Sequence, residues 1–328
     1  MKYKENLTAA GQKHTQNRLV GYLKNLVKQP RRISDIHKSC IQLQQLYTQL
    51  QAQSIQTQQE VSVLKEQLKC CKTVISSNDA LCVQYDWNLL IGLPKGEWRL
   101  AMYLSLGGHF EYGSEVYFRN IVKPGHVVID VGANVGIYTL HALRGGGEVY
   151  AFEPTPETFK VLQNNAALNG FEFSDKVHLN QVAVADKKGF VDFATVEFAC
   201  GHNSMYPENA TDTLIRVPCV TLDEMLEDVE KVDVVKIDVE GAEALVLRGM
   251  EKLVRRSQNI TVMMEYSRTN FERAGVSVED MTEILDELDL KMIRVIDEAT
   301  GALSEPITLY DIADNATQNI VLQKSNRI

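Results

Sequence analysis

The sequence contains no hydrophobic run long enough to cross a membrane. Of its 328 residues, 45% are hydrophobic and 23% are charged, yet no apolar stretch approaches the ~20 residues that a membrane-spanning helix needs. Residues 1–6 also lack the apolar core of a secretion signal. From these two absences we expect a cytoplasmic protein without a membrane span.

Disulfide and metal-binding patterns are absent as well. The cysteines form no Cys-x-x-Cys pair, and no cluster of histidines accompanies them. This spacing disfavours structural zinc and a disulfide framework, so reduced thiols are expected. The six cysteines are Cys40, Cys70, Cys71, Cys82, Cys200 and Cys219.

Excess basic charge is confined to the N-terminus. Residues 1–32 contain eight Lys or Arg and one acid, Glu5, for a net charge of +7. The whole chain carries −9, so the remainder carries −16. An acidic body argues against a nucleic-acid substrate. The basic arm reads as a solvated tail, although contact with an acidic membrane surface, nucleic acid or the acidic body stays open.

A heptad pattern follows the arm. Apolar and small residues recur with alternating spacings of three and four between residues 33 and 71, without Gly or Pro, and Pro30 precedes them. The pattern predicts a coiled-coil helix over 33–75 and a homo-oligomer formed through 33–71, with a long helix packed on its own domain as the alternative. The seam residues are Ile33, Ile36, Cys40, Leu43, Tyr47, Leu50, Ser54, Thr57, Val61, Leu64, Leu68 and Cys71.

Residues 76–120 are predicted to form a small lead-in subdomain. Strands are expected at 81–85 and 87–93 and a helix at 113–122. The segment 98–106 could form either a strand or a helix.

From residue 121 to 328, strand and helix patterns alternate, which is typical of a doubly wound α/β sheet with helices on both faces. The last two strands are joined by a loop and not by a clear helix, which indicates a reversed hairpin at the end of the sheet. Residues 190–196 with 214–220 resemble an added hairpin. Strands are expected near 126–131, 148–153, 177–184, 232–238, 259–266, 291–297 and 317–323. Helices are expected near 136–144, 156–169, 221–228, 242–254 and 278–288.

The run 127–136 is the most specific signal. A short apolar strand ends at Asp130 and enters a helix through Gly132 and Gly136, which is typical of a nucleotide-binding turn. A dinucleotide fingerprint needs a glycine where Asn134 stands. Asp130 would repel a phosphate and attract an ammonium, so a nucleoside with an amino-acid tail, such as S-adenosylmethionine (SAM), fits better.

A second acid supports SAM. The strand expected at 148–153 ends in Glu153, 23 positions after Asp130, which leaves room for one helix and one strand. An acid at the end of the second strand is placed to accept both ribose hydroxyls and to exclude a 2′-phosphate.

Three sequence blocks together resemble the FkbM family of SAM-dependent methyltransferases. They are Val127–Gly136, Ala151–Pro154 and Val235–Glu243, the last reading Val-Lys-Ile-Asp-Val-Glu-Gly-Ala-Glu. The resemblance covers roughly residue 111 to the C-terminus. It implies a seven-stranded Rossmann-like methyltransferase sheet, with residues 76–120 over the edge of the cofactor cleft.

The resemblance also implies O-methylation of a hydroxyl on a sugar, glycan or natural product. Two alternatives stay open: N-methylation of a small amine, and a coiled-coil interaction protein whose domain binds SAM without turnover. The missing middle glycine makes a dehydrogenase the weakest alternative.

The candidate cofactor-binding residues follow from these blocks. Thr139 could donate to the methionine carboxylate or bond to its own helix, and the resemblance places Ala183 beside the adenine. The predicted set is Asp130, Gly132, Ala133, Asn134, Gly136, Thr139, Glu153 and Ala183.

The candidate catalytic residues are Asp238, Glu240 and His202. Asp238 ends the fourth strand, where a carboxylate can orient an acceptor hydroxyl or take its proton. Glu240 and Glu243 could instead favour the helix start. Asp238 with Glu240 could also hold a divalent cation against a diol substrate. Neither histidine nor a third acid lies nearby in sequence, so no metal site is predicted. His202 lies in a polar loop expected beside the site, and Glu265 could line the acceptor pocket.

Overall fold

The computed structural model describes residues 41, 42, 44–46, 48, 49, 51, 74–76, 81–94, 97–195, 203–206 and 213–324. The chain divides into two units, residues 1–66 and 67–328. The described residues between 41 and 51 are helical. The basic arm and most of the predicted coiled coil lie outside the described residues, so self-association through 33–71 stays a prediction.

The second unit is built on a seven-stranded sheet of order β12-β13-β11-β10-β4-β5-β6. Strand β13 runs antiparallel to both neighbours and the other pairs are parallel, which confirms the predicted doubly wound sheet with a reversed last strand. The strands are β4 (Val127–Val131), β5 (Glu148–Phe152), β6 (Val177–Asn180), β10 (Val234–Ile237), β11 (Thr261–Ser267), β12 (Met292–Val295) and β13 (Thr317–Gln323).

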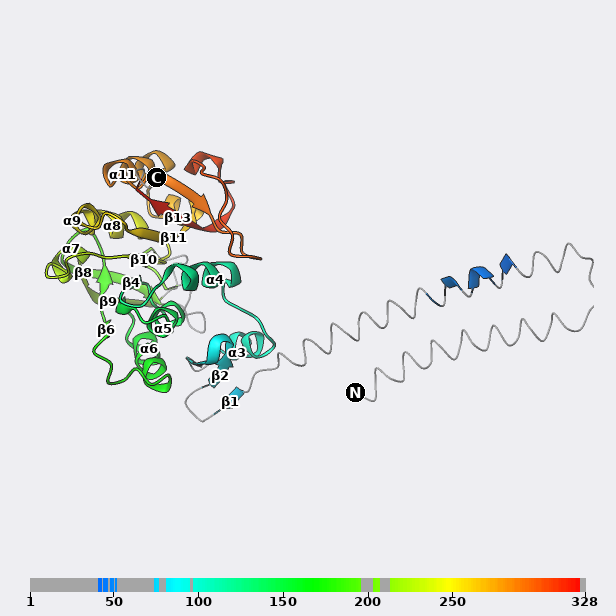
Figure 1. The fold of residues 1–328 in the computed structure, drawn as a ribbon. Helices are drawn as coiled ribbons and strands as arrows, with labels where there is room; N and C mark the ends of the chain where they lie inside the picture. Colours follow the sequence, from blue (N-terminus) through cyan, green and yellow to red (C-terminus); the bar gives the residue numbers. More distant parts are fainter. Residues whose placement is uncertain are drawn as a thin grey trace, which may run out of the picture. The chain divides into compact units, whose positions relative to one another are not determined.

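Helices cover both faces of this sheet (Figure 1). Successive residues of a strand point to opposite faces, so Val128 and Val234 pack with one helix layer while Ile129 and Val235 pack with the other. The first layer contains α4 (Tyr112–Ile121), α5 (Ile137–Arg144) and α6 (Pro156–Leu168). The second contains α7 (Leu222–Met225), α8 (Glu243–Arg248), α9 (Glu251–Arg256), α10 (Arg268–Arg273) and α11 (Val278–Glu287).

Three segments differ from the sequence expectation. The strand expected at 177–184 divides, and its end, β7 (Ala183–Val184), joins a separate sheet with β8 (Gly189–Thr195) and β9 (Thr213–Val220). The helix expected at 242–254 divides at Gly249, where a Cβ would lie 2.1 Å from the Ala185 carbonyl oxygen. Helix α10 was not predicted. In the described part of the chain, no helix is long and apolar enough to span a bilayer.

The lead-in subdomain is a three-stranded antiparallel sheet followed by a helix. Its strands are β1 (Val74–Ser76), β2 (Leu81–Tyr85) and β3 (Leu89–Leu93), and the ambiguous segment forms α3 (Trp98–Ser105). Short 3₁₀ turns occupy Asp86–Asn88 and Leu309–Asp311.

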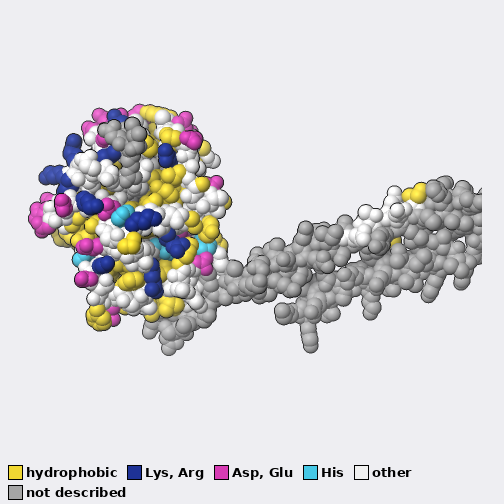
Figure 2. Space-filling model, in the orientation of Figure 1, with side chains coloured by type: hydrophobic (Ala, Val, Ile, Leu, Met, Phe, Trp, Pro, Cys, Tyr) yellow, Lys and Arg dark blue, Asp and Glu magenta, His cyan; other side chains and the backbone are white. Residues whose placement is uncertain are grey.

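On the face seen in Figure 2, basic and acidic side chains are interspersed with hydrophobic ones.

Two asparagines, one in α6 and one at its C-terminal end, join this subdomain to the main domain. Asn165 accepts from the Gly92 N–H at 2.6 Å and donates to the carbonyls of Gly92 (3.0 Å) and Val135 (2.7 Å). One turn later, Asn169 bonds both backbone groups of Leu90. The two amides therefore pair with the edge of β3 as a neighbouring strand would, and Asn165 also supports the glycine turn.

Replacing Asn165 with Ala should lower the free energy of unfolding by about 3 kcal/mol, because it strands buried backbone groups. The matched control is Asn164→Ala, since Asn164 is exposed on the same helix, and it should change stability by less than about 0.5 kcal/mol. Denaturant unfolding measures both. Equal losses would show that the Asn165 amide does not dock the subdomain.

Candidate functional site

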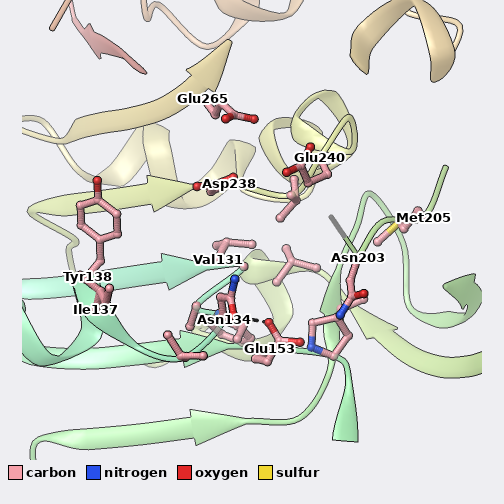
Figure 3. Close-up of a pocket in the computed structure, with 18 of the residues that line it drawn as sticks. Val131, Asn134, Ile137, Tyr138, Glu153, Asn203, Met205, Asp238, Glu240 and Glu265 are labelled. Atoms are coloured by element: carbon pink, nitrogen blue, oxygen red, sulfur yellow. Dashed lines mark hydrogen bonds between the residues drawn. The ribbon is translucent and has the colours of Figure 1, made fainter. Parts of the chain in front are cut away.

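A cavity of about 490 Å³ opens at the carboxyl ends of β4, β5 and β10. Figure 3 shows side chains from all three strand ends facing it. This volume falls within the range of small-molecule sites. Predicted residues that line it are Gly132, Ala133, Asn134, Glu153, Ala183, Asp238 and Glu240.

The glycine turn forms the floor of the cavity. Gly132 has φ +80°, and a Cβ there would lie 1.8 Å from the Asp238 carbonyl oxygen, so only glycine fits. Asn134 has φ +50°, a conformation that asparagine tolerates better than most residues. The N–H groups of Gly132 and Ala133 both donate to the Phe152 carbonyl at 3.0 Å. The turn is thus fixed by its two neighbouring strands before any ligand binds.

Glu153 is held beside this floor. Its Oε2 accepts from the Asn134 N–H at 3.1 Å, and its Oε1 accepts from the N–H and hydroxyl of Thr155 at 2.9 and 2.5 Å. Burial raises the pKa of the Glu153 carboxyl, and these hydrogen bonds oppose the rise. An acceptor is therefore fixed in the position that the sequence predicted for a ribose ligand.

Three predicted cofactor residues do not line the cavity. Asp130 is 2% exposed and accepts from the Thr139 hydroxyl at 2.6 Å. Thr139 is fully buried, so its hydroxyl serves this contact and does not face a ligand carboxylate. Gly136 packs against Leu162, with φ +95°. All three support the turn from behind, because the face of β4 that carries Asp130 is covered by α5.

Asp130 is strongly affected by its burial. Desolvation raises the pKa of Asp130 to about 6, although the Thr139 hydrogen bond and the nearby Lys236 oppose the rise. A carboxyl group with this pKa is still mostly charged at neutral pH, but Asp130 is buried and is not among the lining residues of the cavity.

Lys236 is a functional residue that the sequence reasoning missed. It is fully buried on β10, and its ammonium donates to Asp238 Oδ2 and to Asn319 Oδ1, both at 3.1 Å. Burial lowers the pKa of Lys236, but the carboxylates of Asp238, Glu111 and Glu265 raise it more, so it stays charged. A lysine in an otherwise apolar strand was the signal that could have identified it.

The structure supplies the third acid that the sequence seemed to lack. Carboxylate oxygens of Asp238, Glu240 and Glu265 lie within 4.8 Å of one another, and Figure 3 shows the three side chains converging. Burial, and then repulsion from Asp238 and Glu240, raise the pKa of Glu265 to about 9. A proton on Glu265 or a divalent cation could each relieve this repulsion.

The remaining candidates separate into different roles. Glu243 is buried and accepts from the Gly241 N–H at 3.0 Å, so it caps its own loop, as the helix-start interpretation predicted. Glu240 has φ +53° and accepts from the Asn270 amide at 2.9 Å. His202 lies outside the described residues, and its neighbour Asn203 lines the cavity.

Two further cavity residues come from outside the predicted blocks. The Tyr138 hydroxyl donates to Glu111 Oε2 at 2.7 Å, and both residues line the cavity. Burial raises the pKa of the Glu111 carboxyl, an effect that Lys236 opposes. The lead-in subdomain therefore contributes an acid to the site.

Comparison with known proteins identifies related sequences. A model of the methyltransferase FkbM domain matches residues 130–292. The 31-O-demethyl-FK506 methyltransferase FkbM of Streptomyces tacrolimicus is 30% identical over 195 residues, 57% of this chain and 72% of that protein.

Two other relatives are more distant. Hexuronic acid methyltransferase AglP of Haloferax volcanii is 28% identical over 166 residues, 50% of this chain and 63% of that protein. The 2-O-methyltransferase NoeI of Sinorhizobium fredii is 24% identical over 187 residues, 51% of this chain and 74% of that protein. The chain thus spans less than two thirds of the Haloferax relative.

Replacing Glu153 with Gln should weaken SAM binding about tenfold or more, since losing a hydrogen bond to a charged group costs about 1.5–3 kcal/mol. Glu157→Gln, on the exposed first turn of α6, is the control and should leave the affinity unchanged. Calorimetric titration gives the Kd, and melting without SAM confirms that both variants fold. Unchanged affinity in Glu153→Gln would disprove the ribose assignment.

Proposed function

The chain belongs to the FkbM family of SAM-dependent methyltransferases, and on that premise we propose that it methylates a hydroxyl group of a sugar, glycan or natural product. The observation that carries the proposal is the position of the Asp238 carboxylate. It lines the cavity beside the glycine turn and contacts the buried ammonium of Lys236. The names of the FK506 and NoeI relatives specify oxygen as the methylated atom, which supports O-methylation.

The residues present fit the cofactor. Glu153 would accept the ribose hydroxyls, the turn Gly132–Asn134 would underlie the amino-acid end, and Ala183 would leave space beside the adenine. When bound there, SAM supplies an electrophilic methyl group on a sulfonium. The positive cofactor suits a cavity whose lining includes the carboxyl groups of Asp238 and Glu240.

Asp238 would act on the acceptor. A hydroxyl becomes a stronger nucleophile as it loses its proton, and a carboxylate within hydrogen-bond reach can orient it and take that proton. Lys236, 3.1 Å from the Asp238 carboxylate, fixes its orientation and is itself fixed by Asn319. The rate gain then comes from alignment as well as from proton transfer.

Glu265 would complement Asp238. With a pKa of about 9 it is protonated at neutral pH, so it can donate a hydrogen bond where Asp238 accepts one. Two neighbouring carboxyl groups can divide the donor and acceptor roles when one of them carries a proton. Together they would hold the acceptor hydroxyl between a donor and an acceptor.

Replacing Asp238 with Asn should lower methyl transfer about 100-fold or more while SAM binding stays within about threefold, because the amide cannot take a proton. Asp228→Asn, at an exposed position, is the control. The assay offers SAM and a panel of methyl hexosides and small amines, and mass spectrometry with NMR assigns the methylated atom.

Each outcome of this assay distinguishes one alternative. Methylated amines would replace the O-methyl proposal with N-methylation. SAM binding without any transfer would favour the interaction protein. Full activity in Asp238→Asn would remove Asp238 from the reaction.

A further inference from the structure

A second, larger cavity adjoins the cofactor cavity. It measures about 940 Å³, and the two cavities share Phe110, Glu111 and Glu265 as lining residues. Glu265 carries a carboxylate oxygen within 4.8 Å of one on Asp238. A molecule in the second cavity could therefore place a hydroxyl beside Asp238 without entering the cofactor cavity.

The walls of the second cavity combine aromatic rings with hydrogen-bonding groups. Tyr103, Phe110 and Tyr112 are among the lining residues and are 55%, 38% and 44% exposed. Exposed aromatic side chains gathered on a concave surface are typical of binding sites. Ser304, Thr317, Gln318 and Asn319 add hydroxyl and amide groups to the lining. Aromatic faces combined with donors and acceptors suit a sugar ring, which has apolar C–H faces and a hydroxyl rim.

The charge of this cavity is one-sided. Its described lining residues include four acids, Glu111, Glu265, Asp297 and Glu298, and no Lys or Arg. They also include one histidine, His109, whose Nε2 lies 2.8 Å from the Asp86 carboxylate. Lys236 lies behind the wall and is matched by Asp238. Even with Glu111 and Glu265 protonated, the exposed Asp297 and Glu298 remain without a cation among the lining residues. Such a wall repels a carboxylate and attracts an ammonium.

We propose that the second cavity is the acceptor site and that it takes a sugar without a carboxylate, with an amino sugar preferred. This inference rests on the proposed function, because it names the class of acceptor for the same Asp238. It also separates this chain from its hexuronic acid relative, since a hexuronate would bring a negative charge to an acidic wall.

The test measures binding of three probes to the full chain loaded with S-adenosylhomocysteine: methyl glucoside, methyl glucosaminide and methyl glucuronide. At low salt the glucosaminide should bind about tenfold tighter than the glucuronide, because the two probes carry opposite charges. This ratio corresponds to a difference of about 1.4 kcal/mol in binding free energy. Saturation-transfer NMR titrations give the affinities. A preference for the glucuronide, or no binding of any probe, would overturn the proposal.

Two substitutions, with one control, test whether the sugar binds in the second cavity. Tyr103→Ala should weaken glucosaminide binding about fivefold, whereas Tyr310→Ala, at a tyrosine 56% exposed outside the cavity, should not. Gln318→Lys should improve glucuronide binding and weaken glucosaminide binding. An unchanged affinity in Tyr103→Ala, with S-adenosylhomocysteine binding intact, would place the sugar elsewhere. Because these readouts need no turnover, sugar binding that persists without any methyl transfer would count against the proposed function alone.

Discussion

The buried ammonium of Lys236 is the constraint on which the site depends. A charge inside a sheet costs several kcal/mol unless it is paired and fully hydrogen-bonded. One partner, Asp238, directly follows the same strand, whereas the other, Asn319, comes from the reversed strand β13. Asn319 of β13 pairs in register with Glu265 of β11, and Met263 of β11 pairs in register with Lys236 of β10. Strand β11 therefore lies between Lys236 and the strand that carries Asn319. The reversed strand thus does more than close the sheet, since it delivers the amide that fixes Lys236 and, through it, Asp238.

A close backbone contact couples the two halves of the site. Gly132 belongs to the first block and Asp238 to the third, yet no Cβ fits between Gly132 and the Asp238 carbonyl. The Asp238 N–H also donates to the Val131 carbonyl at 3.0 Å. The cofactor floor and the proposed base are therefore one rigid unit, and movement of either would misalign methyl donor and acceptor. This explains physically why blocks so far apart in sequence occur together.

The sequence predicted strand ends well and side-chain directions poorly. The positions of Glu153 and Asp238 followed from apolar runs that stop at acids, the sheet from alternating strands and helices, and its reversed strand from the loop that joins the last two strands. Asp130 also ends such a run, but whether it faces a ligand depends on α5 packing over that face of β4, which no local pattern reveals. Glu265 and Glu240 meet because parallel strands β10 and β11 end at one edge, a tertiary fact. Lys236 was visible in sequence but was taken as part of a motif, and its partner Asn319 lies 83 positions away.

The residues proposed to bind the methyl donor and those proposed to bind the acceptor lie in different parts of the chain. The glycine turn, Glu153, Ala183 and Asp238 all lie within residues 130–292, which the family model matches. Apart from Glu265, the described residues that line the second cavity come from 103–112, 295–304 and 317–319, outside that match. A family can therefore keep one methyl donor while its members change acceptors, because the acidic and aromatic wall can vary without touching the cofactor floor. The two cavities share Glu265, which lies beside Asp238, and under the proposed O-methylation the acceptor would present its hydroxyl there. On this proposal, the acceptor specificity of this chain would depend on the charge and shape of segments outside the matched domain.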